Sequence, residues 1–434
     1  MYLAPRGTFD ILPEDQPYWQ YLYEQIQRVV TLFDYQRIDI PVFEETSLYV
    51  RGVGEGTDIV DKEMYSFVDK GDRDITLRPE FTAGIVRAYI QHGMKTLPQP
   101  VKLYTVGPLF RYERVQAGRY RQHTQFDIEC IGSLDPAVDL EVMSLAWYLY
   151  SELGFQDLSF QLNSTGCPEC RPAYIERLVS YYESRRSAIC EDCERRLARN
   201  PLRLLDCKVD SCQPVIADAP HMIDYLCPEC AEHLATLRSY LEMLERPYTL
   251  NHRLVRGLDY YGRTVFEWVT DRLGAQGTVC AGGRYDGLVE QLGGRHTPAA
   301  GFAMGIERLL SLLEADGGLP LAPVPHAYLM LAGAGTGSAG VELSEQLRDQ
   351  VPGLRLQVNC GGGGFKAQMR RADRSGARLA LILGETELAE GQVTVKPLRE
   401  GQTEQHTVAM GELAHHLARI LDLTTAEPRT MEND

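Results

Sequence analysis

The sequence lacks an apolar run long enough to cross a membrane, and its first residues (MYLAPRGTFDILPED) lack the basic-then-apolar order of a signal peptide. Both absences argue against a membrane protein or a secreted one, so we expect a cytoplasmic protein. An excess of basic residues is also missing, because 44 Lys and Arg stand against 60 Asp and Glu, for a net charge of −16. This balance argues against non-specific nucleic-acid binding over the whole surface, but it leaves room for a local basic patch.

Glycine-based nucleotide motifs are either absent or incomplete. The chain has no G-x-x-x-x-G-K-[ST] phosphate loop. The stretch GAGTGSAG, residues 333–340, does contain G-x-G-x-x-G between a predicted strand and a predicted helix. However, the next predicted strand leads into Asn359 and Cys360 and offers no acidic residue for a ribose. We therefore interpret these glycines as a flexible turn.

The chain is long and apolar enough for several domains. With 434 residues and 44% hydrophobic content, it is expected to form roughly two to four of them. Before residue 164 the sequence has both helix and strand patterns, whereas residues 164–245 have helical segments with paired cysteines. Strand patterns then return, with a strand expected over 264–269. A final apolar helix is expected over 301–313. We place the domains at residues 1–163, 164–245, 246–320 and 325–421, followed by a disordered tail over 422–434.

Cysteines are concentrated in the second of these segments, where eight of the 11 lie. They form the pairs Cys167/Cys170, Cys190/Cys193, Cys207/Cys212 and Cys227/Cys230. Three pairs have the C-x-x-C spacing that lets two thiolates share one tetrahedral zinc ion. We expect structural zinc, in two four-cysteine sites or in one site with spare thiols, and the pairing stays open. The alternative is a metal-free module with small buried thiols.

Arginines and carboxylates interrupt apolar patterns at three places. TLRPEFTAG contributes Arg78, Glu80 and Thr82, the hairpin FRYERVQAGRYRQHTQFDIECIG contributes Arg111, Glu113, Arg119, Gln125 and Glu129, and GFAMGIERLL contributes Arg308. Guanidinium groups bind phosphate oxygens bidentately, and carboxylates hold magnesium or an ammonium group. Any one of these residues is better explained as a surface ion pair. The set as a whole is not, because Arg111 and Glu129 interrupt apolar strands.

The stretch LVRGLDYYGRTVFEWV, residues 254–269, combines two kinds of sequence. Its second half is β-branched and aromatic and predicts a buried strand. Its first half places Arg256, Asp259, Tyr260 and Tyr261 beside glycines. We interpret the first half as a binding loop at the beginning of a supporting strand.

These motifs resemble those of a known family. FRYERVQAGRYRQH resembles motif 2 and GFAMGIERLL resembles motif 3 of the class II aminoacyl-tRNA synthetases, while IDIPVFE is similar to motif 1, whose proline lies at a dimer interface. Together, RGTFDILPED, TLRPE-x-TAG, LVRGLDYY and AGGRYDGL resemble the bacterial histidyl-tRNA synthetases, over residues 6–421. Phe81 departs from this pattern, because the family more usually has glycine there, and we expect its ring to turn away. Gly262, after the two tyrosines, is a second departure.

The resemblance implies an α/β protein with three parts. These are an α+β catalytic domain with the class II antiparallel sheet flanked by helices, a helical cysteine-rich insertion, and a C-terminal α/β anticodon-binding domain. The implied reaction is activation of L-histidine with ATP and Mg²⁺ to histidyl-adenylate, followed by transfer to the 3′ end of the histidine-specific tRNA, in a homodimer. The basic helix FKAQMRRADRSGAR would then face the anticodon, although alone it is better explained as a solvated helix face.

The resemblance also assigns roles to residues. It places Arg111, Glu113, Arg119 and Arg308 on ATP, and it places Glu80, Thr82 and Gln125 on the α-amino group of histidine. Arg256 would contact the α-phosphate and the substrate carboxylate, and Arg111, Arg256 and Arg308 would be the catalytic residues. Glu129 and Tyr261 would pair with the imidazole nitrogens, with Tyr260 lining the pocket. Such a pocket rejects apolar amino acids, because its polar groups would be left unpaired.

Two other functions fit parts of this pattern. One is a regulatory paralogue that senses histidine without aminoacylating, and the other is an amide-forming synthetase that uses the same adenylation chemistry. Paralogues of the first kind typically lack the C-terminal domain and lose motif residues, whereas Arg111, Glu129, Arg256 and Arg308 are all present here. The C-terminal domain also weakens the amide-forming alternative.

Overall fold

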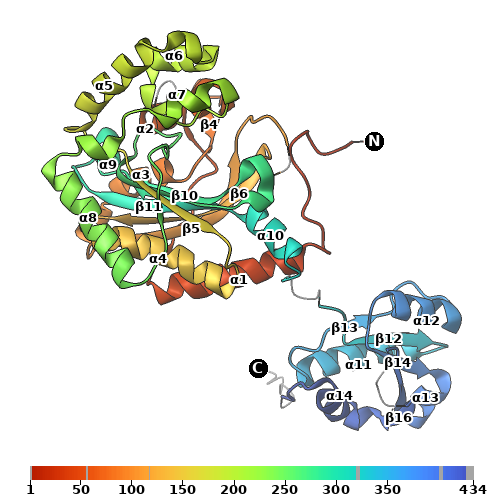
Figure 1. Ribbon diagram of the computed structural model, residues 1–434. Coiled ribbons are helices and arrows are strands. Elements are labelled where there is room, and N and C mark those ends of the chain that lie inside the picture. Colours follow the sequence, from red (N-terminus) through yellow and green to blue (C-terminus); the bar gives the residue numbers. More distant parts are fainter. Residues whose placement is uncertain (1, 55–56, 117, 319–322, 400–403, 427–434) are drawn as a thin grey trace. The chain divides into compact units, whose positions relative to one another are not determined.

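The computed structural model describes residues 2–54, 57–116, 118–318, 323–399 and 404–426. The chain divides into two compact units, residues 1–320 and residues 321–434, which are described separately below (Figure 1). The finer division of the first unit into two catalytic parts and an insertion stays a prediction.

An eight-stranded sheet forms the centre of the first unit, as far as the described residues go. Its order is β1 (Gln36–Arg37), β5 (Val101–Phe110), β6 (Gln122–Ile131), β11 (Ala299–Gly305), β10 (Thr278–Arg284), β9 (Gly262–Val269), β7 (Ser159–Ser164) and β8 (Thr249–Leu250). The outer pairs β1–β5 and β7–β8 are parallel, and all other neighbours are antiparallel.

Four helices cover one face of this sheet (Figure 1). They are α1 (Gln16–Leu32), α4 (Pro136–Glu152), α8 (Pro228–Met243) and α10 (Ile306–Ala315). Successive strand residues point to opposite faces, and in β6 the core receives Phe126, Ile128 and Cys130. The residues between them, Gln125, Asp127 and Glu129, therefore point to the other face. This alternation places polar groups along the side of the sheet that the four helices leave uncovered.

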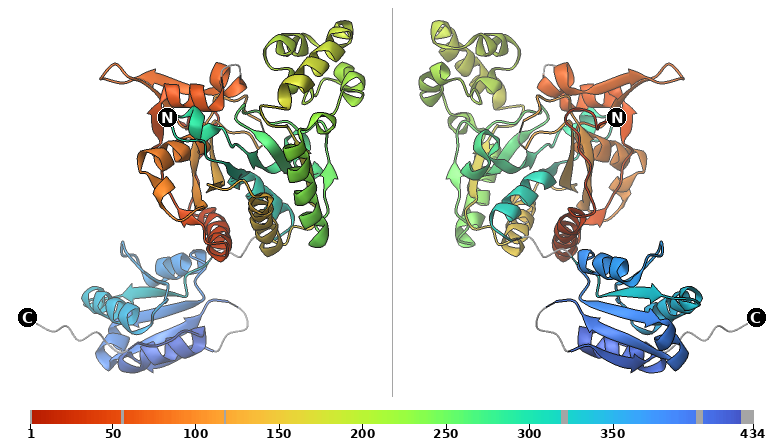
Figure 2. Two further views of the ribbon diagram at one scale, coloured as in Figure 1. Left: turned by 90° about the vertical axis from the view of Figure 1, so that its left-hand side faces the viewer. Right: turned by 90° about the vertical axis from the view of Figure 1, so that its right-hand side faces the viewer.

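The other side of the sheet carries smaller elements. A second core joins α3 (Thr82–Gln91) and α9 (Leu288–Gln291) to the sheet, and α2 (Thr46–Val53) packs nearby. A three-stranded antiparallel sheet, β2 (Phe43–Glu45), β4 (Asp74–Leu77) and β3 (Tyr65–Val68), lies on this side, and a π-helical turn, η1 (Ile59–Glu63), stands next to it in the chain. In Figure 2 this small sheet (orange) and the cysteine-rich segment (yellow-green) rise from the same side of the large sheet.

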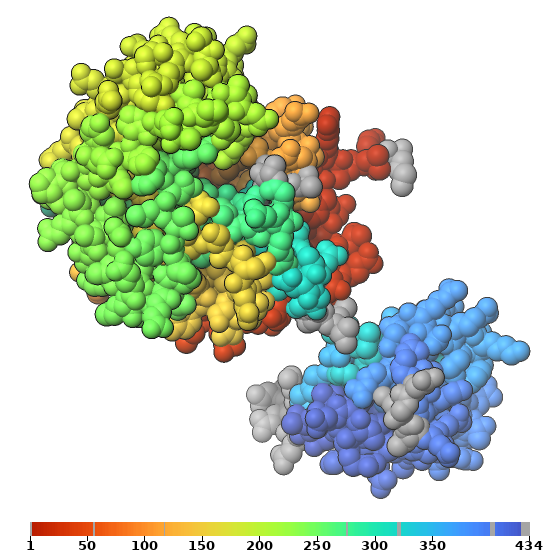
Figure 3. All heavy atoms as spheres, viewed as in Figure 1, coloured from red at the N-terminus to blue at the C-terminus, as the bar shows by residue number. Residues whose placement is uncertain are grey.

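The cysteine-rich segment has a core of its own. Its helices are α5 (Arg171–Glu183), α6 (Glu191–Arg199) and α7 (Gln213–Ala217), joined by the 3₁₀ turns η3 (Arg186–Ala188), η4 (Pro201–Leu204), η5 (Asp210–Cys212) and η6 (Met222–Tyr225). Leu178, Tyr182 and Leu204 are fully buried there among the cysteines. The last helix of the predicted insertion, α8, instead buries Leu237 and Leu241 in the main core. Figure 3 shows the segment as a yellow-green cap over the unit.

In its described residues, the second unit is a five-stranded sheet with helices. The strand order is β13 (Leu356–Val358), β12 (Ala327–Ala332), β14 (Leu379–Gly384), β15 (Gln392–Pro397) and β16 (His406–Ala409), of which the first three are mutually parallel. The helices are α11 (Thr336–Gln350), α12 (Phe365–Arg374), α13 (Glu385–Glu390) and α14 (Leu413–Leu421). Beyond α14, the amide of Ala426 donates to Gln350 O at 2.9 Å. Residues 427–434 of the predicted tail lie outside the described residues.

The predicted fold class is confirmed, but one predicted element is wrong. Residues 299–305 form strand β11, and the helix expected from 301 begins only at Ile306. β11 pairs with β6 on one side and β10 on the other. The apolar and small residues of GFAMG suit either a helix or a buried strand, so only these long-range pairings decide. In the C-terminal unit, the basic stretch FKAQMRRADRSGAR is helical only as far as Arg374, so its last arginine, Arg378, lies beyond the end of α12.

Candidate active site and cysteine centres

A cavity of about 960 Å³ lies over the uncovered face of the large sheet. Ten of the eleven predicted catalytic and substrate-binding residues line it: Glu80, Thr82, Arg111, Glu113, Arg119, Gln125, Arg256, Tyr260, Tyr261 and Arg308. The eleventh, Glu129, is only 1% exposed and lies in the sheet behind the lining. Residues from α3, β6, β9, β10, β11 and the cysteine-rich segment thus meet around one space.

Small residues on the sheet make room for this cavity. Along β6, Gln125 pairs with Gly107 and Gly305, while Glu129 pairs with Leu103 and Gly301. A Cβ atom on Gly301 would stand 2.0 Å from Glu129 Oε2 and 2.3 Å from the carbonyl oxygen of Ile128. Only glycine therefore leaves the Glu129 carboxylate in its place.

Buried carboxylates and tyrosines gather at one part of the cavity. Glu80 accepts hydrogen bonds from the amide of Ala83 at 2.9 Å and from the hydroxyl of Tyr260 at 3.4 Å. The hydroxyl of Tyr285 donates to Glu129 Oε2. Burial raises the pKa of Glu129 to about 8 and also raises the pKa of Glu80. Burial, with Glu129 and Glu80 nearby, raises the pKa of Asp127 well above its usual range.

Three arginines gather at another part of the cavity. Arg111 Nε donates to Pro79 O at 2.7 Å, and Arg308, in the first turn of α10, donates to Thr278 O. Arg119 Nε lies 3.1 Å from Glu113 Oε2, while Arg111 Nη1 lies 4.0 Å from the other Glu113 oxygen. Glu63 and Glu307 also line the cavity. Three guanidinium groups gathered in one place can bind the oxygens of a polyphosphate.

The positive charge of this arginine cluster acts on a nearby histidine. His123 lines the cavity on β6. Burial, together with Arg111 and Arg308, lowers the pKa of His123 to about 3. The ring is therefore neutral near neutral pH and adds no charge to the cluster.

Arg256 also lines the cavity, in the loop before β9. Its Nη1 forms an ion pair with Glu267 Oε1, and its guanidinium lies 5.5 Å from the ring centroid of Tyr261. Glu267 Oε2 in turn accepts a hydrogen bond from Thr278 Oγ1 at 3.2 Å. Arg256 Nε has no hydrogen-bond partner among the described residues. The guanidinium is thus held by a carboxylate at the wall of the cavity.

Several residues of the site were missed from the sequence. Asp127 shares the site face with Gln125 and Glu129, so the two-residue period of the strand could have identified it. Glu267 interrupts the apolar run TVFEWV, which is a similar signal. Tyr285 lies in AGGRYDGL, and nothing in that stretch of sequence indicates that its hydroxyl donates to Glu129.

The two departures from the family pattern do not obstruct the cavity. Phe81 is fully buried in the second core and is absent from the lining, so its ring turns away as expected. The Arg78 guanidinium lies 4.7 Å from the centroid of this ring. Gly262 is the first residue of β9.

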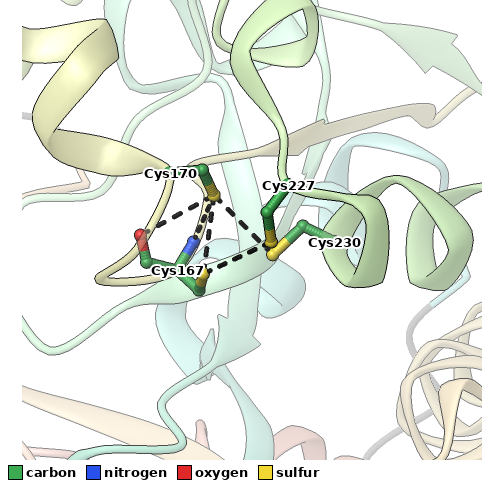
Figure 4. A group of neighbouring side chains, drawn as sticks. All are labelled: Cys167, Cys170, Cys227 and Cys230. Atoms are coloured by element: carbon green, nitrogen blue, oxygen red, sulfur yellow. Dashed lines mark hydrogen bonds between the residues drawn. The ribbon is translucent and has the colours of Figure 1, made fainter.

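The eight cysteines of the insertion form two groups of four. The first centre joins Cys167 and Cys170 to Cys227 and Cys230, and the second centre is Cys190, Cys193, Cys207 and Cys212. Within each group the Sγ atoms all lie within 4.8 Å of one another. Figure 4 shows the sulfur atoms of the first centre converging from two separate segments. Among the open pairings, the structure therefore favours two four-thiol sites.

The sulfur distances fit a tetrahedral metal. Four sulfurs around zinc, each with a Zn–S bond of about 2.3 Å, lie about 3.8 Å from one another. In the first centre, the Cys167–Cys227 and Cys170–Cys230 sulfur distances are 3.7 and 3.8 Å. In the second, Cys190–Cys207 is 3.8 Å and Cys193–Cys212 is 4.0 Å.

The backbone around both centres also favours anionic thiolates. Cys170 and Cys227 are the N-cap residues of α5 and α8, and Cys190 and Cys212 are those of α6 and α7. The positive end of a helix stabilises a thiolate, which is the form that binds metal. The donor set and its setting thus suit zinc.

The basic residues of α12 lie on the surface of the second unit. Lys366, Arg370, Arg371 and Arg374 are exposed. Arg371 Nη1 donates to Asn359 Oδ1 at 2.8 Å and to Gly362 O at 2.7 Å, which ties the helix to the glycine-rich turn before it. The described parts of both units contain no helix that is long and apolar enough to cross a membrane.

An antiparallel sheet of this kind, with motif arginines and carboxylates around a cavity on one face, defines the class II aminoacyl-tRNA synthetases. The model of the histidyl-tRNA synthetase family matches residues 7–309, and the model of the anticodon binding domain matches residues 333–420. The chain belongs to the histidyl-tRNA synthetase family.

Individual relatives agree with this assignment. Histidine–tRNA ligase of Dehalococcoides mccartyi is 50% identical over 414 residues, which are 95% of this chain and 98% of that protein. The ligase of Halorhodospira halophila is 51% identical over 416 residues, which cover 96% and 97% of the two chains. The crystal structure of apo S. aureus histidyl-tRNA synthetase is similar with a TM-score of 0.80 and 37% identity, covering 96% of this chain and all of that one.

Proposed function

We propose that the protein is a histidine–tRNA ligase that activates L-histidine with ATP and transfers the histidyl group to the 3′ end of its tRNA. The observation that carries this proposal is the arrangement of a single cavity. Arginines suited to a polyphosphate occupy one part, buried carboxylates and tyrosines suited to histidine occupy another, and Arg256 also lines the cavity.

The amino-acid pocket is proposed to bind both ends of histidine. Glu80, Thr82 and Gln125 hold the α-amino group, and Glu129 and Tyr261 pair with the imidazole nitrogens. Tyr260 lines the same pocket and donates to Glu80. An apolar amino acid would leave these buried groups without partners, at a cost of about 1–3 kcal/mol each. Selectivity for histidine therefore arises from hydrogen bonding, and no editing domain is needed.

Activation joins two anions, the histidine carboxylate and the α-phosphate of ATP. Arg256 is proposed to bind both, because its guanidinium lines the cavity and is held in place by Glu267. It orients the carboxylate for attack and stabilises the negative charge that develops on the phosphate. Pyrophosphate then leaves, and histidyl-adenylate remains.

The arginine cluster is proposed to bind ATP. Arg111 and Arg308 contact its phosphates, Arg119 approaches a phosphate from the turn of the hairpin, and Glu113 stands near the adenine or the magnesium ion that accompanies the nucleotide. Arg111, Arg256 and Arg308 are thus the proposed catalytic residues. The ion pair between Arg119 and Glu113 keeps this cluster organised before ATP arrives.

Each cysteine centre is proposed to hold one structural zinc ion. Catalytic zinc does not fit, because four thiolates leave no open position for a substrate. Metal analysis of the purified protein should give two zinc ions per chain, and Cys170→Ser should lower the count to about one. Cys360→Ser, at an exposed position of the second unit, should leave the count unchanged. A wild-type count near zero would refute the proposal.

The tRNA is proposed to contact both units of the chain. The exposed basic side chains of α12 suit the anticodon region, on a protein whose overall charge is otherwise negative. The cysteine-rich segment would contact the acceptor arm, since it borders the cavity through Arg203 and Lys208. Such a reaction belongs in the cytoplasm, where charged tRNA is used.

A homodimer is proposed from the motif 1 region. Pro41 lines a groove of about 800 Å³, and the neighbouring Val42 and Phe43 are 41% and 53% exposed. Apolar side chains exposed beside a groove favour contact with a second copy. Light scattering should give twice the chain mass, and Phe43→Glu should shift the protein toward the monomer. A wild-type monomer at working concentration would contradict the dimer.

Histidine-dependent ATP–pyrophosphate exchange, followed by charging of tRNA, tests the function. The wild-type protein should catalyse both steps, and Arg256→Ala should abolish exchange while the melting temperature stays near the wild-type value. Arg295→Ala, at an exposed arginine of the same unit, is the matched control. No exchange with histidine would refute the synthetase, and exchange without charging would favour the amide-forming alternative.

A further inference from the structure

We propose that Arg171 is a positioning residue that transmits the geometry of the first cysteine centre to the histidine-binding loop. Arg171 directly follows Cys170, and its Nη2 donates to the carbonyl oxygen of Tyr261 at 2.6 Å. The proposal rests on the proposed function, in which the side chain of Tyr261 pairs with the imidazole. In this way the first centre positions the histidine-binding loop, residues 254–261, as well as stabilising the insertion.

The Arg171 guanidinium donates hydrogen bonds to backbone carbonyl oxygens. Besides Tyr261 O, its Nε donates to Thr165 O at 3.2 Å and its Nη2 to Gly166 O at 3.3 Å. Two of these carbonyls precede Cys167 and the third belongs to the histidine loop. One guanidinium therefore fastens the loop to the segment that carries the first two thiols. The rigid planar fork of arginine suits several acceptors at once, and lysine would satisfy fewer of them.

The backbone joins the same two segments. The amide of Thr165 donates to Arg263 O at 2.8 Å, and the amide of Arg263 donates to Gly166 O at 2.9 Å. These bonds extend the β7–β9 ladder from Ser164 up to the residue before Cys167. A shift of the first centre is thus a shift of the strand start that immediately follows Tyr261.

Gly166 shows how little space separates the centre from this ladder. Its φ is +66°, and a Cβ atom there would lie 2.9 Å from Cys170 Sγ and 2.0 Å from Met222 Cε. The turn is therefore formed by a residue that must be glycine, because no side chain fits between it and the thiol group.

The same loop is also held from the helix that begins at the second centre. Asn200, at the C-cap of α6, donates to Asp259 Oδ1 at 2.8 Å. α6 begins at the second centre with Cys190 as its N-cap. The loop is thus attached to segments of both centres, and Arg171, beside the first centre, donates to the backbone of Tyr261.

Loss of the Arg171 contact should weaken histidine binding and leave ATP binding intact. The arginines assigned to ATP lie in the turn between β5 and β6 and on α10, and the three hydrogen bonds of Arg171 described above reach neither element. We expect Arg171→Ala to raise the KM for histidine about tenfold, which corresponds to one hydrogen bond of about 1.4 kcal/mol. The KM for ATP should stay within about twofold.

The experiment compares four single variants and one double variant of the full-length protein. Arg171→Ala should keep two zinc ions per chain, raise the KM for histidine and show faster amide hydrogen exchange in residues 256–261. Arg171→Lys should bring the histidine KM and the exchange rate part of the way back to the wild-type values. Arg177→Ala, at an exposed position of the same helix, should match the wild type. Cys170→Ser should lose one zinc ion, and it should also raise the histidine KM and speed hydrogen exchange in residues 256–261. The double variant with Arg171→Ala should raise the histidine KM little further than Cys170→Ser alone.

The outcomes separate the coupling from the function. If Arg171→Ala and Arg177→Ala have equal histidine KM values and equal hydrogen exchange over residues 256–261, the coupling is overturned. If the wild-type protein shows no histidine-dependent exchange of pyrophosphate, the proposed function fails, and hydrogen exchange still decides whether Arg171 holds the loop. Fully additive effects of the two substitutions would show that Arg171 acts independently of the centre, which also overturns the proposal.

Discussion

Tyr285 donates its hydroxyl hydrogen to the carboxylate of Glu129, and both side chains are about 1% exposed. This bond fixes one carboxylate oxygen of Glu129 beneath the cavity. The Glu129 carboxylate also occupies the space that a side chain at Gly301 would fill. The position of one acceptor beneath the cavity is therefore set by a tyrosine and by a glycine.

Removal of the Tyr285 hydroxyl tests this arrangement. Tyr285→Phe should raise the KM for histidine about tenfold, because Glu129 loses the donor that orients it and a lost hydrogen bond costs about 1–1.5 kcal/mol. The KM for ATP should not change. Tyr104→Phe is the matched control, since the Tyr104 hydroxyl donates to Gln27 at 2.6 Å in the main core, on the other face of the sheet. Equal effects of both variants would argue against an orienting role.

Stability should fall with pH through Glu129. Burial raises its pKa from 4.5 to about 8, so the folded protein binds a proton that the unfolded chain releases. This contribution to stability is complete below about 4.5 and is lost progressively as the pH rises through about 8. Within that window, the unfolding free energy of the wild type should fall more steeply than that of Glu129→Gln, by up to about 1.4 kcal/mol per pH unit. Urea unfolding of the ligand-free protein checks this, and parallel pH profiles would contradict it.

A single methyl group at position 301 should disable the amino-acid pocket. Gly301→Ala places a Cβ atom against Glu129 and against the backbone of β6, so the carboxylate or the strand must move. We expect histidine-dependent pyrophosphate exchange to fall by about two orders of magnitude, consistent with a misplaced binding group. Gly287→Ala adds the same methyl group where no atom lies within 4 Å, and it should retain activity. Normal exchange by the Gly301 variant would place the histidine site elsewhere.

The basic face of α12 should act on tRNA alone. Replacing Lys366, Arg370 and Arg374 together with alanine should raise the KM for tRNA at least tenfold, while histidine-dependent exchange without tRNA stays unchanged. The salt dependence of tRNA binding should weaken, because each lost phosphate contact lowers the logarithmic slope by about 0.7–0.9. Arg419→Ala, at an exposed arginine on α14, is the control. An unaltered KM for tRNA in the triple variant would exclude this face.

The sequence predicts much of the site because polar residues interrupt apolar strands there. Arg111 and Glu129 are conspicuous for that reason, and Arg256 is conspicuous as a charged residue in a glycine-containing loop before a strand. Arg111 and Arg256 line one cavity and Glu129 lies behind its lining, although their roles stay predictions. Asp127 obeys the same alternation and was overlooked. The partner of Glu129 could not be found this way, because Tyr285 is 156 positions away and only the folded sheet brings the two together.

Long-range contacts also explain the other differences. Residues 301–305 were expected in a helix, yet pairing with both β6 and β10 makes them a strand. The grouping of the cysteines was left open because C-x-x-C spacing defines half a site, and the fold joins the first pair to the last.

The first cysteine centre also has a consequence for chain topology. Cys167 and Cys227 are 60 positions apart, and their convergence closes the intervening chain into a loop at the edge of the sheet. Closing such a loop costs conformational entropy, which a metal held by its two ends would offset locally. The strands on either side then meet as though joined by a short connection, whatever length of chain the loop contains. Changes in length confined to residues 172–226 should therefore leave the register of β7 on β9 unchanged.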